Sequence, residues 1–224
     1  MPEKTVVIAC STIRPELQAA MARCGLQYPV FYMDARLHDR PEELHRMVQD
    51  KLDSLTGIGR VLLPFGYCGG TTIGLRAGEF ELILPKADDC ITLFLGSRAN
   101  RRAVPDERYT FFLTQGWLDS DRNLLAEYAR LREKYSQKRA DRVMEAMYQN
   151  YHALGLVDTG LFPLEPQVET CGRISDLLHL EPRVLPGTWN LLQTLLQGPW
   201  DDPGLLRIGP GEEITKAHFG SEIF

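Results

Sequence analysis

The sequence lacks any apolar run long enough to cross a membrane, and it has no excess of basic residues. Its 224 residues include 25 Lys and Arg against 30 Asp and Glu, a formal net charge of -5. Because a membrane span needs about 20 apolar residues and nucleic-acid binding usually needs positive charge, we expect neither partner. The first apolar run has only about five residues, too short for a secretory signal, so we expect a cytoplasmic protein.

Cysteine is scarce and never closely paired. The five cysteines form no Cys-x-x-Cys motif, the usual signature of structural zinc. An odd number of scattered thiols favours free, catalytic or metal-bound cysteines over disulfides. Repeats, low-complexity tracts and linkers are also absent. We therefore predict that residues 1–224 form a single domain.

Short apolar runs alternate with amphipathic segments, which predicts an α/β protein with an open, mostly parallel sheet and flanking helices. We expect helices that open near Pro15 and Pro41 and that cover residues 72–77 and 188–197. The predicted strands are residues 5–10, 29–33, 60–64, 80–84, 109–113, 183–185 and 205–208.

Residues 118–154 contain almost no helix breakers and follow helical periodicity. They predict one long helix or a helix pair, packed on or beside the sheet. Its charges are mixed in sign, which is typical of a solvated face. Together with the aromatic residues around Trp117, this segment can supply the surface of a homodimer.

Three cysteines each follow a predicted strand. Cys10 ends the first apolar run, Cys68 follows residues 61–64, and Cys90 comes a few residues after residues 82–85. Because parallel strands share a carboxyl edge, and ligands bind there, we expect the three thiols to lie together. All three also precede predicted helix starts, where backbone N–H groups favour a thiolate. Three ligands from separate strands leave a fourth metal position open for a small-molecule substrate.

A buried free cysteine is also an ordinary core residue, and this alternative stands beside the site for each of the three. Cys24 lies on the apolar face of the first predicted helix, and Cys171 lies outside any predicted element. We interpret both as structural.

Other polar residues near these strand ends are candidates with simpler alternatives. His38, preceded by Asp34, can act as a ligand or as a proton carrier, or be a solvated loop residue. Asp89 can be an acid or base beside Cys90, but either it or Asp88 suits a helix cap. Two further groups are predicted to bind substrate. Gly69 and Gly70 let backbone approach a ligand closely, and Ser97 with Arg98 can grip an anion or form a flexible, solvated loop.

Several segments together resemble the domain-of-unknown-function family 1638 of bacteria and archaea. They are Cys10, residues 37–41, 66–69, 89–91 with 96–98, 116–117 and 198–200. Members are often encoded near corrinoid-dependent methyltransferase systems, so the resemblance implies one-carbon or methylamine-type metabolism and a corrinoid or methyltransferase protein as partner. The ligand pattern is also similar to diphthamide-synthesis and quinolinate-synthase proteins, which hold a four-iron cluster with three separate cysteines. This chain lacks their threefold domain repeat.

Three hypotheses follow. The first is a metal-dependent enzyme, or a partner of one, whose Cys10, Cys68 and Cys90 hold an iron-sulfur cluster or a zinc or iron ion. The second is a metal-free racemase or isomerase of small carboxylates, similar to the aspartate/glutamate racemase group, in which two cysteines exchange an α-proton. The third is a non-catalytic partner of a corrinoid protein.

Overall fold

The computed structural model describes residues 4–121 and 123–220 and contains two sheets. The first has the order β2-β1-β3-β4-β8, and the second has the order β5-β6-β7. All pairs are parallel except β4 with β8. The α/β class and the mostly parallel pairing are confirmed, but the strands divide between two sheets instead of one. The strands are β1 (Thr5–Cys10), β2 (Val30–Met33), β3 (Arg60–Leu62), β4 (Glu81–Pro85), β5 (Thr110–Leu113), β6 (Ala153–Asp158), β7 (Glu181–Pro186) and β8 (Leu205–Ile208).

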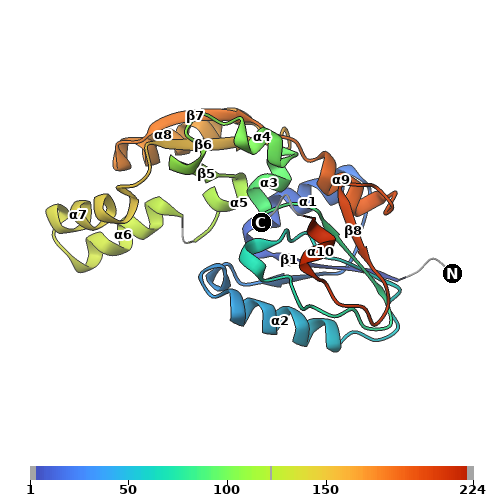
Figure 1. The fold of residues 1–224 in the computed structure, drawn as a ribbon. Helices are drawn as coiled ribbons and strands as arrows, with labels where there is room; N and C mark the ends of the chain where they lie inside the picture. Colours follow the sequence, from blue (N-terminus) through green and yellow to red (C-terminus); the bar gives the residue numbers. More distant parts are fainter. Residues whose placement is uncertain (1–3, 122, 221–224) are drawn as a thin grey trace.

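Helices cover both faces of the first sheet, with α2 on one face and α1 and α9 on the other (Figure 1). Alternate residues of β1 enter different cores: Val6 and Ile8 pack with α2, whereas Val7 and Ala9 pack with α1. This explains why β1 reads as a continuous apolar run, since neither face meets solvent. The helices are α1 (Arg14–Arg23), α2 (Pro41–Asp53), α3 (Cys90–Leu95), α4 (Arg98–Arg102), α5 (Gln115–Leu118), α6 (Leu124–Lys134), α7 (Gln137–Tyr148), α8 (Leu164–Leu178), α9 (Asn190–Gln197) and α10 (Lys216–Phe219).

The core between α1 and the first sheet also contains residues of the second sheet. Val157 of β6 and Leu185 of β7 belong to the same buried cluster as Val7 and Leu62. The two sheets therefore share apolar contacts, and the segment between β4 and β5 passes from one to the other. This arrangement places the end of β5 beside the first turn after β1.

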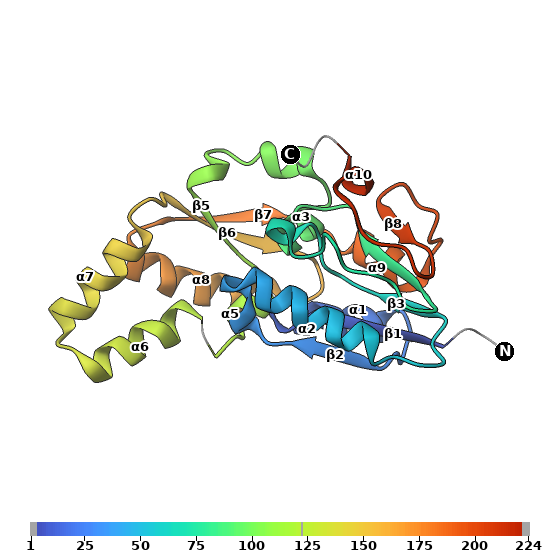
Figure 2. The same cartoon turned by 60° about the horizontal axis from the view of Figure 1, so that its bottom comes forward.

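The predicted helical segment 118–154 is a helix pair followed by a strand. Helices α6 and α7 form a hairpin that projects from the second sheet (Figures 1 and 2), tied by the Tyr128 hydroxyl, which donates to Asp141 at 2.6 Å. Its last part was predicted wrongly, because Leu154 lies in the fully buried part of β6 and not in a helix.

Two further segments differ from the sequence prediction. Residues 72–77 form turns and an isolated bridge between Arg76 and Glu213 instead of a helix, and Gly74 has a positive φ of 87°. Helix α8 was not predicted. Within the described ranges, none of the helices combines the length and apolar character that a membrane crossing requires.

Candidate functional site

The three strand-end cysteines meet at one edge of the first sheet. Cys10 is the last residue of β1, Cys68 lies in the loop after β3, and Cys90 is the first residue of α3, shortly after β4. Strands β1, β3 and β4 are neighbours and run parallel, so their carboxyl ends coincide. All three cysteines line the same cavity, as the sequence predicted.

Close backbone contact draws the Cys68 loop onto the loop that carries Cys90. The backbone N–H of Cys68 donates to the carbonyl of Asp88 at 2.7 Å, and that of Tyr67 donates to Ala87 at 2.8 Å. A Cβ at Gly66 would lie 2.5 Å from the Ala87 carbonyl oxygen, so only glycine fits there. This contact fixes the two cysteines relative to each other.

Cys68 itself has a left-handed backbone. Its φ is 48°, and φ stays positive at Gly69 (65°) and Gly70 (97°). Glycine adopts this conformation without cost, whereas a residue with a Cβ is disfavoured by about 1–2 kcal/mol. Such strain often marks functional sites. The two glycines thus shape the turn that presents Cys68, and Gly69 also lines the cavity.

The three thiols lie close enough to repel one another as anions. Desolvation raises the pKa of Cys68 to about 12, with further contributions from the charges of Asp89 and Cys10, against a smaller opposing hydrogen bond from Gly66. Desolvation likewise raises the pKa of Cys90, and the charges of Asp89, Cys68 and Cys10 add to the rise. The net effect at Cys68 and Cys90 favours the neutral thiol over the thiolate.

Cys10 has a different environment. It is 8% exposed, and its sulfur accepts a hydrogen bond from the Thr12 hydroxyl at 3.1 Å. In residues 4–121 and 123–220, no group of three Cys, His, Asp or Glu side chains stands at the spacing of ligands to a single metal ion. The thiols are therefore neighbours without forming a compact three-ligand set.

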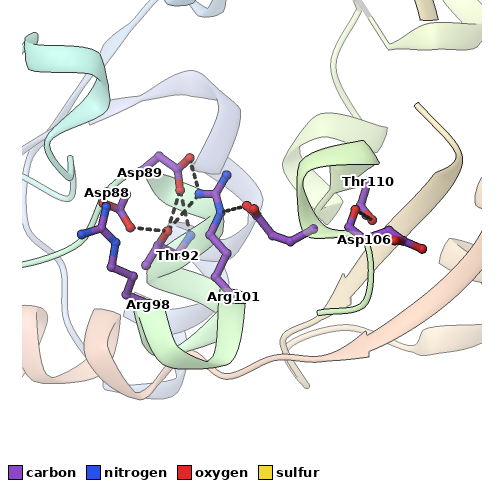
Figure 3. Close-up of polar contacts among 8 residues, drawn as sticks. Asp88, Asp89, Thr92, Arg98, Arg101, Asp106 and Thr110 are labelled. Atoms are coloured by element: carbon purple, nitrogen blue, oxygen red, sulfur yellow. Dashed lines mark hydrogen bonds and ion pairs between the residues drawn. The ribbon is translucent and has the colours of Figure 1, made fainter. Parts of the chain in front are cut away.

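Asp89 lines the cavity and connects two elements of the site. It caps α3, because one carboxylate oxygen accepts from the Thr92 backbone at 2.8 Å, and the other meets Arg101 at 2.6 Å (Figure 3). Arg101 also binds Glu107 at 2.7 Å, which ties α4 to the segment that leads into β5. The predicted alternative that one of the two aspartates is a helix cap thus applies to Asp89.

Arg98 and Ser97 have separate roles. Arg98 pairs with Asp88 at 2.8 Å and lines the cavity, and its Nη1 atom is buried without a hydrogen-bond partner (Figure 3). Ser97 caps α4 by accepting from the Asn100 backbone at 3.0 Å and lies outside the cavity wall, as does Gly70. The predicted substrate-binding set therefore reaches the cavity through Arg98 and Gly69.

His38 lines the same cavity and lies in the short helix Ala35–Asp39, which follows β2 of the first sheet. Its ring meets Trp117 of α5 edge-on, with centroids 5.4 Å apart. Asp34 instead caps that short helix and pairs with Arg36. His38 thus faces the same space as the thiols and packs against α5, the helix that follows β5. Trp117, which the sequence assigned to a homodimer surface, also lines this cavity.

The cavity has a volume of about 1130 Å³ and lies between the carboxyl edge of the first sheet and residues of the second. Besides the thiols, its wall includes three further arginines, Arg101, Arg102 and Arg108, and a set of aromatic side chains from β5 and the end of α7. This is a concave space with convergent polar groups, the usual form of a ligand site.

A comparison with known protein families shows which family the chain belongs to. A family model described as a protein of unknown function, DUF1638, matches residues 32–196. The chain belongs to the DUF1638 family. The match includes Cys68, Cys90 and the cavity arginines, and Cys10 lies before it. No curated protein and no solved structure matches the chain.

One buried acid of this DUF1638 chain was not found from the sequence. Glu16 of α1 is fully buried, and one of its oxygens accepts from the Gly116 backbone at 3.0 Å. Its other oxygen and the Thr114 hydroxyl have no partner at hydrogen-bond geometry, although the hydroxyl is near enough to favour the charged acid. Desolvation nevertheless raises the pKa of Glu16, and Asp119 adds to the rise. Glu16 thus joins α1 to the turn after β5.

Replacing Glu16 with alanine is expected to destabilise the protein by about 1–3 kcal/mol, because the Gly116 N–H is left buried without an acceptor. Glu16→Gln keeps an acceptor and should be nearly neutral at low pH. Since the folded state holds the Glu16 proton more tightly than the unfolded chain, wild-type stability should fall relative to Glu16→Gln as pH rises through the raised pKa. Urea denaturation across pH measures both effects, and equal pH dependence of the two proteins would contradict this role.

Proposed function

We propose that this protein binds an iron-sulfur cluster through Cys10, Cys68 and Cys90, and that the open side of the cluster faces a small-molecule ligand in the cavity. The observation that carries the proposal is the convergence of three free thiols, from three adjacent parallel strands, on one cavity. Thiolates are the usual ligands of such clusters, and three of them leave one iron free for a ligand.

The donor set favours a cluster over a single zinc or iron ion. The charge of one thiolate raises the pKa of its neighbours, yet no three-ligand group at single-ion spacing is found in the part of the chain that the structure describes. A cluster is larger than an ion and accepts thiolates that stand farther apart. A positive metal centre also removes the protons of coordinating thiols, which offsets their raised pKa.

The protein's own residues would prepare this site for a ligand. When bound, the cluster would supply a Lewis-acidic or redox-active iron at the cavity wall. Arg98 offers its unpaired Nη1 N–H to an anionic group, and His38 faces the same space as a carrier of protons. Asp89 acts as a positioning residue, because it fixes both the start of α3 at Cys90 and the side chain of Arg101.

The metal-free alternative, proton exchange by two cysteines, requires a thiolate at neutral pH. The cysteines that resemble the racemase pair are Cys10 and Cys68, and the pKa of Cys68 is raised by desolvation and by the charge of Asp89, which opposes this state. We therefore rank it second. A role beside a corrinoid-dependent methyltransferase remains the proposed setting, based on the family resemblance.

Iron and acid-labile sulfide in anaerobically purified protein test the proposal. We expect both elements in amounts comparable to the protein, with visible absorbance that disappears in air. Zinc without sulfide would instead indicate a single ion. Metal-free protein that exchanges the α-proton of a carboxylic acid with solvent deuterium would support the two-cysteine alternative.

A further inference from the structure

The cavity is larger than the site at the thiols requires. Its volume of about 1130 Å³ exceeds the ~300–1000 Å³ of pockets that hold drug-sized ligands. The cysteines occupy only the wall formed by the first sheet. The opposite wall comes from α4, the residues that lead from it into β5, β5 itself and the end of α7, and it contains none of the proposed cluster ligands.

This second wall presents a cluster of aromatic rings. Phe111 of β5 meets Tyr148 and Tyr151 edge-on, with centroids 5.4 and 5.2 Å apart. All three are only half-buried, although they pack on one another, and all three line the cavity. Aromatic side chains that keep exposed area in a concave site suit the face or edge of a planar ring.

Two arginines at this wall have no acidic partner among the described residues. Arg98 and Arg101 pair with Asp88, Asp89 and Glu107. By contrast, Arg102 and Arg108 form no ion pair or side-chain hydrogen bond with any residue in the described ranges, and both are exposed at the cavity.

Two acidic side chains act at the ring cluster: the pKa of Tyr148 is raised by desolvation and further by the charges of Glu127 and Asp39. Glu127 lines the cavity but pairs with Arg130 at 2.6 Å, and Asp39 lies on the wall after β2 with His38. Planar guanidinium groups without a carboxylate partner favour phosphate oxygens, which they bind through two parallel hydrogen bonds.

We propose that the second-sheet wall of the cavity is a nucleotide-binding subsite. Arg102 and Arg108 bind the phosphates, and the ring packs against Tyr148, Tyr151 and Phe111. Recognition by side chains replaces the glycine-rich phosphate loop of other nucleotide sites. This subsite uses no cysteine, so it stands independently of the proposed cluster.

Calorimetric titration of the full-length protein with ATP, in buffer without metal ions, tests the subsite. We expect ATP to bind about tenfold more tightly than either adenosine or pyrophosphate, because only ATP uses both the rings and the arginines. The double variant Arg102→Ala/Arg108→Ala should weaken ATP binding by about tenfold or more. Since both side chains are exposed, this variant should fold normally.

Matched controls separate the subsite from general effects. Tyr148→Leu should lose about tenfold in ATP affinity, whereas Tyr148→Phe, which keeps the ring, should bind normally. Arg142→Ala, on the same helix as Tyr148 but outside the cavity wall, should also bind normally. Cys68→Ser should retain ATP binding, which distinguishes this inference from the cluster proposal. Failure of the wild type to bind ATP, equal affinity for pyrophosphate, or normal binding by the double variant would overturn it.

Discussion

Cys68→Ser protein, purified without oxygen, is expected to contain roughly a tenth or less of the iron and sulfide of the wild type. Loss of even an indirect partner of a metal ligand commonly costs 10- to 100-fold in affinity, and here a ligand itself is removed. Serine matches cysteine in shape at the strained φ of 48°, so the loop that carries it should be kept. Cys10→Ser and Cys90→Ser should have the same effect.

Cys24→Ser is the matched control for this series. Cys24 is a free, half-buried cysteine at the end of α1 and lies outside the cavity wall. Its variant should therefore contain as much iron and sulfide as the wild type. Comparable losses in the control and in Cys68→Ser would assign the effect to general thiol chemistry. Normal loading of Cys68→Ser would remove that residue from the ligand set.

Gly116→Ala is expected to destabilise the protein by about 3 kcal/mol, near the upper end of ordinary overpacking effects. A Cβ at Gly116 would lie 1.9 Å from the Thr12 carbonyl oxygen and 2.9 Å from Glu16, so α5 would have to move away from the turn after β1. That movement would also disturb the Thr12 hydroxyl, which donates to Cys10. Iron loading should therefore fall together with stability.

Gly172→Ala provides the contrasting control. Gly172 lies inside α8, and an added Cβ would meet no atom within 4 Å. Alanine favours a helix over glycine by about 0.5–1 kcal/mol, so this variant should be as stable as the wild type or slightly more stable. Urea denaturation measures both proteins. Equal stability of the two variants would contradict the close packing of α5 on the first sheet.

Elements with strong local signals were predicted correctly from the sequence. Strands β1, β3 and β4 read as apolar runs because the middle of the first sheet is buried on both faces, and Pro15 and Pro41 marked the starts of α1 and α2. Since neighbouring parallel strands share an edge, the meeting of Cys10, Cys68 and Cys90 could also be predicted.

The missed elements had ambiguous local signals. No glycine or proline separates Tyr148, at the end of α7, from β6, so the helical periodicity continued into the strand. Helix α8 contains Pro166 and Gly172, which normally argue against a helix. Pro166 is tolerated because it lies in the first turn, where a proline leaves no helical hydrogen bond unmade.

The remaining features of the site depend on contacts between distant segments. Gly66 matters because its backbone packs against Ala87. Glu16 matters because it accepts a hydrogen bond from the backbone N–H of Gly116, 100 positions away. The role of Asp89 likewise depends on Arg101, which turns a candidate acid into a cap and an ion pair. Residue type and local spacing contain no information about these partners.

A Mössbauer spectrum of iron-enriched protein, purified without oxygen, tests the central claim most directly. The account predicts a cluster spectrum with one iron distinct from the others, as expected when three thiolates bind a cluster and one iron remains open. This spectrum should be absent from the variant that lacks Cys10, Cys68 and Cys90 together. A spectrum of isolated iron ions alone, or one that is the same in the triple variant, would contradict it.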